Sequence, residues 1–550
     1  MHAGSSMKGG KWFRFLNTAL DTLNPHVVKT AVMDLGFEAG FYGLRTRDAA
    51  KAKYHCNIPW AILFDPTSAC NLHCIGCWAA EYGHTLNLSF DVMDKIVREG
   101  KALGCHFYLL TGGEPLMRKK DILRLCRKHP DCEFHAFTNG TLIDDAFCDE
   151  VTDVGNLSFS LSIEGFREVN DSRRGEGDFD KVMHAMDLLR KHGIVFGTSI
   201  CYTRKNIDTV TSDEFLDLLI KKGVWFTWYF HYIPVGNDAS LDLLPTEEQR
   251  AYMVRRVREI RSVKGGKPIF AIDFQNDGQF IDGCVAGGRN YCHINPNGDV
   301  EPCVFIHYSS ANINNQSLLS CLQQPLFKEY AKGQPFNRNH LRPCPMLENP
   351  QYLAAMVKRS GAKSTDLQSP ESAEHLCNKC KAYAVQWKPT ADKARLMPYS
   401  GNRQPTSCGL KSKLIKKKKP RKRRSTALSP PLIRRSPMNI QIFGTKKRFD
   451  TKKAIRYFKE RNIKTQFIDL KEKGLSKGEY TKVKQAVGGL DAMLNPKCKD
   501  QDTLARIQYA VDDEKDANVL ANQQVLKTPI VRNGAKATVG YVPEVWKTWE

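Results

Sequence analysis

The sequence predicts an α/β protein built on a partial (βα)6 TIM-like barrel, followed by a small cysteine-rich extension and a separate C-terminal α/β domain. Three observations predict this architecture. Strand-like and helix-like segments alternate from about residue 58 to 235, cysteine and glycine become frequent over 276–400, and a basic stretch at 401–437 precedes new regular elements. Parallel strands need a crossover between them, so the alternation favours parallel β/α units.

Residues 1–55 are predicted to form an N-terminal helical extension. The segment KWFRFLNTALDTL at 11–23 interleaves apolar and polar residues as an amphipathic helix does. We expect this helix to pack on the main domain. A membrane-surface anchor is the alternative.

The barrel is predicted over residues 56–275. Its six strands are expected at 61–65, 106–111, 133–138, 157–162, 195–200 and 225–231. The intervening helices are expected near 89–103, 118–129, 142–152, 178–192 and 211–222. A flat, doubly wound sheet is the alternative arrangement of these elements.

The chain changes character twice after the barrel. Regular periodicity fades over 276–400, and 401–437, with KKKKPRKRR at 416–424, is predicted to be a disordered basic linker. A compact domain is predicted over 438–550. Its elements are expected to be a strand at 439–443, a helix near 451–460, a strand at 465–470, a helix near 476–488 and a hairpin around Asn533–Gly534.

Composition and charge restrict the class of protein. A hydrophobic fraction of 41% excludes wholesale disorder. No stretch approaches the ~18–20 apolar residues of a membrane span, and no secretory signal is present, so we expect a soluble, cytoplasmic protein. The net charge of +23 is uneven, because residues 411–435 hold twelve Lys or Arg and no acidic residue. Only this linker suggests nucleic acid as a partner. We do not expect nucleic acid to be the main partner of the protein.

Eighteen cysteines in a reducing compartment indicate metal ligands or catalytic thiols rather than disulfides. Several stand singly among apolar residues and are expected to be small buried hydrophobes: Cys105, Cys126, Cys148 and Cys201. Cys321 and Cys408 are expected to bind no metal.

The segment CNLHCIGC places thiols at Cys70, Cys74 and Cys77 just after the first predicted strand. These spacings let one loop wrap three corners of a cubane iron–sulfur cluster, which generally takes four thiolates. One iron would then stay open for a substrate or cofactor. A zinc-binding loop is the alternative that this spacing alone allows.

Further motifs end the next strands. In order they are Thr111-Gly112-Gly113-Glu114-Pro115, Thr138-Asn139-Gly140, Ser160-Leu161-Ser162-Ile163-Glu164 and the later segment Arg174-Gly175-Glu176-Gly177-Asp178-Phe179-Asp180. Glycines let a backbone approach a ligand closely, and a carboxylate accepts hydrogen bonds from an ammonium group. The carboxyl ends of strands are where β/α barrels keep their chemistry.

Together, the cysteine loop and these motifs resemble the radical S-adenosylmethionine (SAM) superfamily over about 180 residues. The resemblance implies a [4Fe–4S] cluster on Cys70, Cys74 and Cys77, whose open iron binds SAM. It implies SAM contacts from Gly112, Gly113, Glu114, Pro115, Thr138, Asn139, Ser162, Glu164 and Arg174. It further implies reductive cleavage of SAM to a 5′-deoxyadenosyl radical that abstracts hydrogen, with a low-potential donor such as ferredoxin or flavodoxin. It predicts no other catalytic residue.

One position departs from the family pattern. Many members carry an aromatic residue just before the third cysteine, where this chain has Gly76 followed by Cys77 and Trp78. The sequence therefore does not identify the residue that contacts the adenine of SAM.

A second set of cysteines follows the barrel: Cys284, Cys303, Cys344, Cys377 and Cys380, with Cys292 as an alternative member. A CxxC pair with distant partners is typical of a metal site. The pattern resembles the SPASM or the shorter Twitch extension of radical SAM enzymes, which implies auxiliary [4Fe–4S] clusters. The incomplete cysteine series implies one such cluster, and a four-cysteine zinc site is the alternative.

Residues 438–550 resemble the arsenate-reductase-like (ArsC/Spx) branch of the thioredoxin fold through segments 442–447, 449–454, 526–532 and 539–549. The position of that family's catalytic cysteine is Arg448 here, Pro529 matches the fold's cis-proline, and Arg532 matches a family arginine. The resemblance implies a domain without nucleophilic redox chemistry, acting as an adaptor. An accidental fusion with a neighbouring gene is the other interpretation.

The function expected from these patterns is a radical SAM enzyme of the maturase type that modifies a peptide or protein. Radical chemistry on a small molecule or lipid is one alternative. A regulatory or nucleic-acid-binding role through the linker and the ArsC/Spx-like domain is the other.

Overall fold

The computed structural model divides the chain into two compact units, residues 1–408 and 409–550. It describes residues 10–395 except 264, and residues 440–549 except 446–447, 462, 471, 497, 499, 502, 505–506, 508–511 and 535. The predicted linker at 401–437 and Cys408 lie outside the described residues.

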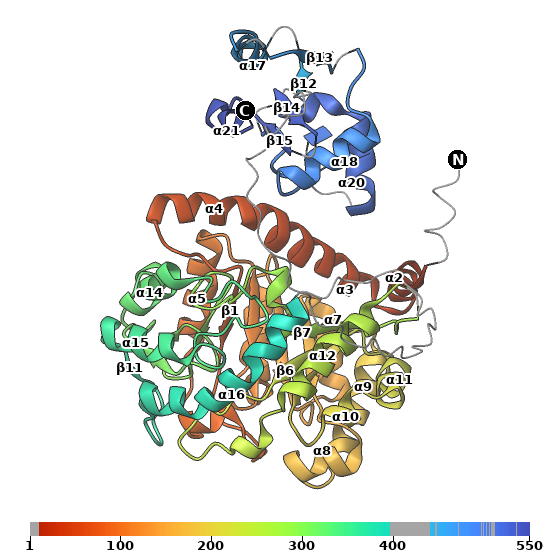
Figure 1. The fold of residues 1–550 in the computed structure, drawn as a ribbon. Coiled ribbons are helices and arrows are strands. Elements are labelled where there is room, and N and C mark those ends of the chain that lie inside the picture. Colours follow the sequence, from red (N-terminus) through yellow and green to blue (C-terminus); the bar gives the residue numbers. More distant parts are fainter. Residues whose placement is uncertain are drawn as a thin grey trace, which may run out of the picture. The chain divides into compact units, whose positions relative to one another are not determined.

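The N-terminal extension is helical. Its elements are α2 (Lys11–Thr22), α3 (Pro25–Thr30), the π-helix η1 (Ala31–Tyr42) and α4 (Gly43–Tyr54). Helices α3 to α4 follow one another as a long rod along the first unit (Figure 1). The predicted packing of α2 on the main domain is confirmed, because the rings of Trp12 and Phe270 lie 6.1 Å apart and those of Phe15 and Trp225 lie 5.1 Å apart.

A nine-stranded sheet forms the centre of the first unit, in the order β7-β6-β5-β4-β3-β2-β1-β8-β9. The strands are β1 (Ala61–Phe64), β2 (Phe107–Leu110), β3 (Glu133–Thr138), β4 (Leu157–Ser162), β5 (Phe196–Tyr202), β6 (Phe226–His231), β7 (Phe270–Asp273), β8 (Tyr291–Ile294) and β9 (Val300–Glu301). Every pairing is parallel except that of β8 with β9. All six predicted strands are present within two residues of their predicted ends.

The strand order supports the barrel over the doubly wound sheet. Strands β1 to β7 are neighbours in chain order, without the reversal of a doubly wound sheet. Residues from each of these seven strands line one cavity, so the sheet curves around it. The sequence analysis missed β7, which is only four residues long.

Helices cover the outside of the sheet. The main ones are α5 (Phe90–Ala102), α6 (Lys119–Lys128), α7 (Asp145–Val154), α9 (Asp178–Lys191), α11 (Asp213–Lys222) and α12 (Glu247–Arg261). Shorter ones are η2 (Trp78–Tyr82), η3 (Pro115–Arg118), α8 (Arg167–Arg174), α10 (Ile207–Val210), η4 (Leu241–Leu243) and η5 (Asn276–Phe280). The local sequence fixes where several of these helices begin. Ser89 caps the N-terminus of α5, and Thr246 with Gln249 forms a capping box at the N-terminus of α12.

The rest of the first unit is small and irregular. It contains β10 (Tyr308–Ser309), α13 (Leu318–Leu322), α14 (Pro325–Gly333), α15 (Pro350–Ser360), β11 (Lys363–Ser364) and α16 (Ala373–Arg395). A fully buried ion pair joins it to the barrel, because Arg250 of α12 lies 2.6 Å from the Glu348 carboxylate.

The buried carboxyl of Asp34, on η1, should make stability depend on pH. Burial, with help from nearby Asp131 and Glu38, raises the pKa of Asp34 to about 7, whereas an unfolded chain has about 3.9. The stability that depends on its neutral form is therefore complete below about pH 4 and is lost as pH rises toward 7. We expect Asp34→Asn to unfold at a higher temperature than the natural chain at neutral pH. The difference between the two unfolding temperatures should become smaller toward pH 5. A difference in unfolding temperature that stays constant between pH 5 and pH 7 would contradict the raised pKa of Asp34.

The second unit is a four-stranded sheet with helices. Its elements are β12 (Ile440–Gly444), α17 (Phe449–Lys459), β13 (Thr465–Asp469), α18 (Lys477–Ala486), α20 (Asp512–Ala521), η6 (Gln523–Val525), β14 (Ile530–Asn533), β15 (Lys536–Val539) and α21 (Pro543–Lys547). The order is β13-β12-β14-β15, with β12 parallel to β13 and the other pairs antiparallel. The predicted strands, helices and hairpin of this domain are confirmed. Among the described helices of the whole chain, none is long and apolar enough to cross a membrane.

Candidate functional site

The three thiols of the cysteine loop face one cavity of about 770 Å³ at the carboxyl end of β1. The loop is held by its own backbone, since Ser68 donates to Leu86 O at 2.9 Å and the Leu72 N–H donates to Cys70 Sγ at 3.4 Å. Burial raises the pKa of Cys70 to about 11 and also raises the pKa of Cys74. Binding a metal would replace these thiol protons.

The glycine loop after β2 packs directly on the cysteine loop. Gly113 donates to Thr67 O at 3.0 Å, and Glu114 N–H donates to Ala69 O at 2.8 Å. A Cβ on Gly113 would lie 2.2 Å from Ala69 O, so no larger residue fits there. The two loops therefore form one rigid wall of the cavity.

Glu114 links this wall to the end of β3. Its carboxylate accepts hydrogen bonds from the Thr138 hydroxyl at 2.6 Å, the Asn139 N–H at 2.8 Å and the Leu116 N–H at 2.9 Å. Burial nevertheless raises the pKa of Glu114. The carboxylate lines the cavity while it orients Thr138 and Asn139, so it both shapes the site and offers an acceptor to a ligand.

Two adjacent arginines of α8 reach the same wall. Arg174 Nη1 lies 3.8 Å from Cys74 Sγ, and its Nε lies 3.5 Å from Asp178. Arg173 pairs with Glu164 at 2.5 Å. The other oxygen of Glu164 is buried without a hydrogen-bond partner among the described residues, which leaves one acceptor for a polar ligand.

The cavity continues from this polar end into an apolar chamber. Inward-facing side chains of the strands line it, among them Trp60, Phe107, Phe137, Trp228, Phe230 and Phe274. Trp228 and Phe230 stand two residues apart on β6 with parallel rings, which strand alternation explains. The cavity wall also includes Arg261 and Asp277, which form an ion pair with each other.

An aromatic ring occupies the space beside Gly76. A Cβ on Gly76 would lie 3.0 Å from the ring of Tyr232, which follows β6 and lines the cavity. On the other side of Cys77, Trp78 packs edge-to-face on His293, at 5.6 Å, and on His307, at 6.0 Å.

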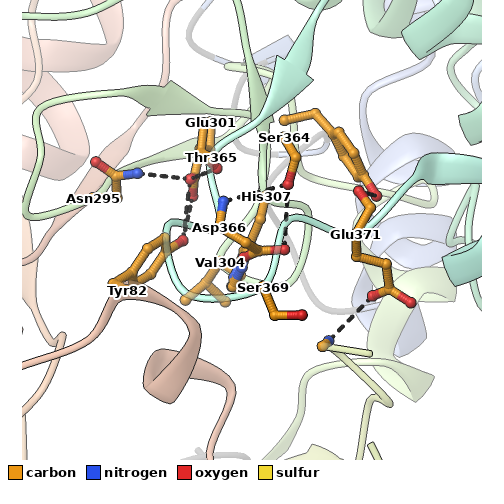
Figure 2. A network of polar contacts seen from close by, with 12 residues as sticks. Tyr82, Asn295, Glu301, Val304, His307, Ser364, Thr365, Asp366, Ser369 and Glu371 are labelled. Atoms are coloured by element: carbon orange, nitrogen blue, oxygen red, sulfur yellow. Dashed lines mark hydrogen bonds and ion pairs between the residues drawn. The ribbon is translucent and has the colours of Figure 1, made fainter. Parts of the chain in front are cut away.

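A buried polar network around Glu301 includes Tyr82, Asn295 and Thr365 (Figure 2). Glu301 accepts hydrogen bonds from the hydroxyls of Tyr82 at 2.9 Å and Thr365 at 2.5 Å. His293 bridges Glu301 at 2.6 Å and Asp65 at 3.1 Å, and although burial lowers the pKa of His293, these two carboxylates raise it to about 10. The network ties β1, η2, β8 and β9 together behind the cysteine loop.

The later cysteines gather in a second place. Cys377 and Cys380 belong to one buried apolar cluster, and the partly buried Cys284, Cys303 and Cys344 pack against that cluster. Burial raises the pKa of each, and Cys284 lies close enough to Cys303 and Cys344 to raise theirs further. The ring of Tyr330 is fully buried near four of them, and its hydroxyl has no hydrogen-bond partner among the described residues. A cluster with sulfide and thiolate acceptors would satisfy that hydroxyl, so the residues fit such a group.

Family models match both sites. The model of the Radical SAM superfamily matches residues 64–219, and the model of SPASM, an iron–sulfur cluster-binding domain, matches residues 284–346. This chain carries a radical SAM domain and a SPASM domain. It is a radical SAM enzyme and uses SAM and a [4Fe–4S] cluster.

Several proteins are similar to parts of this radical SAM enzyme. An AdoMet-dependent heme synthase of Methanosarcina barkeri is 26% identical over 47% of this chain and 81% of its own length. A mycofactocin maturase, MftC, of Mycolicibacterium smegmatis is 29% identical over 45% of this chain and 64% of its own. Among solved structures, Streptococcus suis SuiB bound to precursor peptide SuiA aligns with 18% identity, 60% of this chain, 79% of that chain and a TM-score of 0.46.

The structure brings nearly all predicted SAM residues of the radical SAM domain to one cavity. Lining it with the three cysteines are Gly112, Gly113, Glu114, Thr138, Asn139, Ser162, Glu164 and Arg174. Pro115 is buried and begins η3 instead. Sequence analysis missed Arg173, for which the doublet of arginines was the available signal, and Tyr232, for which there was none.

Two cysteine predictions need correction. Cys201 was expected to be a buried apolar residue, but it lines the radical SAM cavity at the end of β5 near Arg173 and Glu164. Cys292 was named as an alternative ligand, but on β8 it points to the opposite side from Tyr291 and lies in the core between sheet and helices. Cys105, Cys126 and Cys148 are buried as expected, and Cys321 is buried as well.

Proposed function

We propose that this enzyme holds SAM at the polar end of the cavity and a substrate in the apolar chamber, and removes hydrogen from a substrate C–H bond. When bound, the cluster and SAM supply the 5′-deoxyadenosyl radical for this abstraction. The observation that carries the proposal is the single cavity that joins three cysteines, the glycine loop and the aromatic chamber. Its walls would exclude water and solvent-derived hydrogen from the reacting carbon.

We assign residues to three groups: the radical SAM cluster, SAM and the auxiliary cluster. Cys70, Cys74 and Cys77 hold the radical SAM cluster. Gly112, Gly113, Glu114, Thr138, Asn139, Ser162, Glu164 and Arg174 position SAM, with Pro115 fixing the glycine loop. Cys284, Cys303, Cys344, Cys377 and Cys380 supply the ligands of one auxiliary [4Fe–4S] cluster. The barrel at 56–275 and the extension at 276–400 then act as one unit, with a ferredoxin or flavodoxin as the electron donor.

Peptide or protein maturation is the first proposed use of this chemistry. The SPASM domain and the relative named as a maturase support it. A small apolar molecule or lipid is the second candidate, favoured by the aromatic lining of the chamber. Incubation with deuterated candidates, followed by mass spectrometry of 5′-deoxyadenosine, separates them. Deuterium transferred from a peptide supports the first, and transfer from an apolar molecule alone rules it out.

Tyr291 should tune the auxiliary cluster. Its hydroxyl donates to Cys303 Sγ at 2.7 Å, and the ring also lines the chamber. Hydrogen bonds to cluster sulfurs stabilise the reduced form, so Tyr291→Phe should lower the auxiliary potential by on the order of tens of millivolts. An EPR-monitored redox titration measures the shift. Tyr308→Phe is the matched control, because the Tyr308 hydroxyl donates to Glu371 O instead. Equal shifts in both variants would contradict the assignment.

We infer that residues 438–550 form a thioredoxin-like domain without its catalytic thiol. Support comes from the mixed four-stranded sheet, from the position of Pro529 directly before β14, and from Arg448 at the start of α17. Cys498 is buried and its thiol donates to Asp500 O, so it does not replace the missing nucleophile. The domain would serve as an adaptor, or be an accidental fusion. Disulfide-reductase activity in the natural chain would contradict this inference.

A further inference from the structure

Helix η1 exposes a stripe of large apolar side chains. Its members are Val32, Met33, Phe37 and Phe41, and Leu44 at the start of α4 continues them. These five residues are called the outer stripe, and their exposed fractions are 62%, 46%, 46%, 52% and 44%. Hydrogen bonds of a π-helix join residues five apart, so residues four or five apart share one face. The rings of Phe37 and Phe41 stack at 5.9 Å. Contiguous exposed apolar surface of this kind marks an interaction site.

The opposite face already fixes the helix to the barrel. Asp34 and Ala39 are buried, and Ala39 O accepts a hydrogen bond from Trp60 Nε1 at 3.2 Å. A Cβ on Gly43 would lie 2.5 Å from Gly104 O, so helix and barrel are in close contact. The outer stripe is therefore not needed to hold η1 in place.

Cations flank the outer stripe at both ends. Lys29 precedes it, and Arg45 and Lys53 follow it, all exposed. The Arg45 guanidinium lies 4.6 Å from the centre of the Phe41 ring. Over 29–47, where every residue is described, no acidic side chain is exposed, and the exposed Asp48 that follows lies 4.0 Å from Lys51. Apolar residues between exposed cations match the acyl chains and anionic headgroups of a bilayer surface.

Helix α2 adds exposed apolar residues with helical spacing. Phe13, Leu16 and Leu20 are 41%, 60% and 63% exposed. The buried side of this helix packs on Phe270, which lines the chamber and is itself 48% exposed. The N-terminal helices thus present apolar side chains outward while their inner sides contact residues of the chamber wall.

We propose that the outer stripe docks on an anionic phospholipid bilayer, with Phe37 and Phe41 inserted below the headgroups and Arg45, Lys29 and Lys53 bound to them. The proposal goes beyond the chemistry of the cavity and does not depend on it. A monotopic enzyme of this kind lies on the membrane without spanning it.

Vesicle flotation of the full-length, cluster-loaded enzyme tests the proposal. We expect binding to vesicles that contain phosphatidylglycerol, weaker binding to pure phosphatidylcholine, and weakening by salt. The double variant Phe37→Glu and Phe41→Glu should lower the partition coefficient at least about tenfold, because two buried rings are lost from the interface. The matched control is Val385→Glu with Leu241→Glu, two exposed apolar residues elsewhere in the first unit, which should bind like the natural chain. SAM cleavage without substrate should be equal in all three proteins.

Three results would overturn the proposal. The first is a flotation result in which the natural chain does not bind anionic vesicles, or in which the stripe variant binds them as well as the natural chain does. The second is a natural chain that is dimeric by light scattering while the stripe variant is monomeric, since the stripe would then contact a second copy. The third is a change of hydrogen exchange over 440–549 in the stripe variant, which would make the C-terminal unit the occupant.

Discussion

Replacing Cys70, Cys74 and Cys77 together with alanine should abolish the formation of 5′-deoxyadenosine from SAM. The three thiols face the same cavity from one loop, and without them the radical SAM cluster has no ligands. Iron should fall by about four atoms per chain, while the auxiliary cluster stays. Iron analysis and an anaerobic assay with dithionite measure both effects.

Cys201 provides the matched control for this variant. It lines the same cavity but belongs to β5 and not to the cysteine loop. Cys201→Ala should keep both the iron content and SAM cleavage. Equal iron loss in Cys201→Ala and in the triple variant would show that cavity packing, rather than ligation, explains the result.

Among the substitutions predicted here, removing the carboxylate of Glu348 should lower the free energy of unfolding most. Glu348 and Arg250 are both fully buried and lie 2.6 Å apart, and Glu348 also accepts a hydrogen bond from the Cys344 N–H at 2.7 Å. Glu348→Ala leaves the buried guanidinium without its counter-charge, which costs about 3–5 kcal/mol. Anaerobic denaturant unfolding of the cluster-loaded enzyme measures this loss as a lower transition midpoint.

Asp180→Ala is the control for the buried pair. Asp180 pairs with Arg167 on the surface, where both side chains are more than half exposed. Solvent screens such pairs, so the expected cost is below about 1 kcal/mol. A similar loss of stability in both variants would contradict the role given to the buried pair.

Local patterns in the sequence predicted the elements with strong periodicity. The six barrel strands and the first elements of the C-terminal domain are bounded by turn residues and have a clear apolar pattern. The residues of the polar end of the cavity were also predictable, because Cys70, Gly113 and Glu114 stand in short motifs at consecutive strand ends. The residues of such a motif are close together in the sequence, so the motif can be recognised without the structure.

Other features depend on contacts between distant residues. Nothing local distinguishes Cys201 from a core cysteine, because its exposure to the cavity follows from the register of β5. The ring of Tyr232, which directly follows β6, reaches Gly76 from a distant part of the chain. The π-helix η1 and its outer stripe were not foreseen either, since an apolar segment of this length is more often buried.

The most direct test is to reconstitute the natural chain anaerobically with iron and sulfide, count its iron, and assay 5′-deoxyadenosine with SAM and dithionite. Two [4Fe–4S] clusters predict about eight iron atoms per chain and measurable 5′-deoxyadenosine. A chain that holds zinc instead of iron, or that holds iron but leaves SAM intact, would contradict the account.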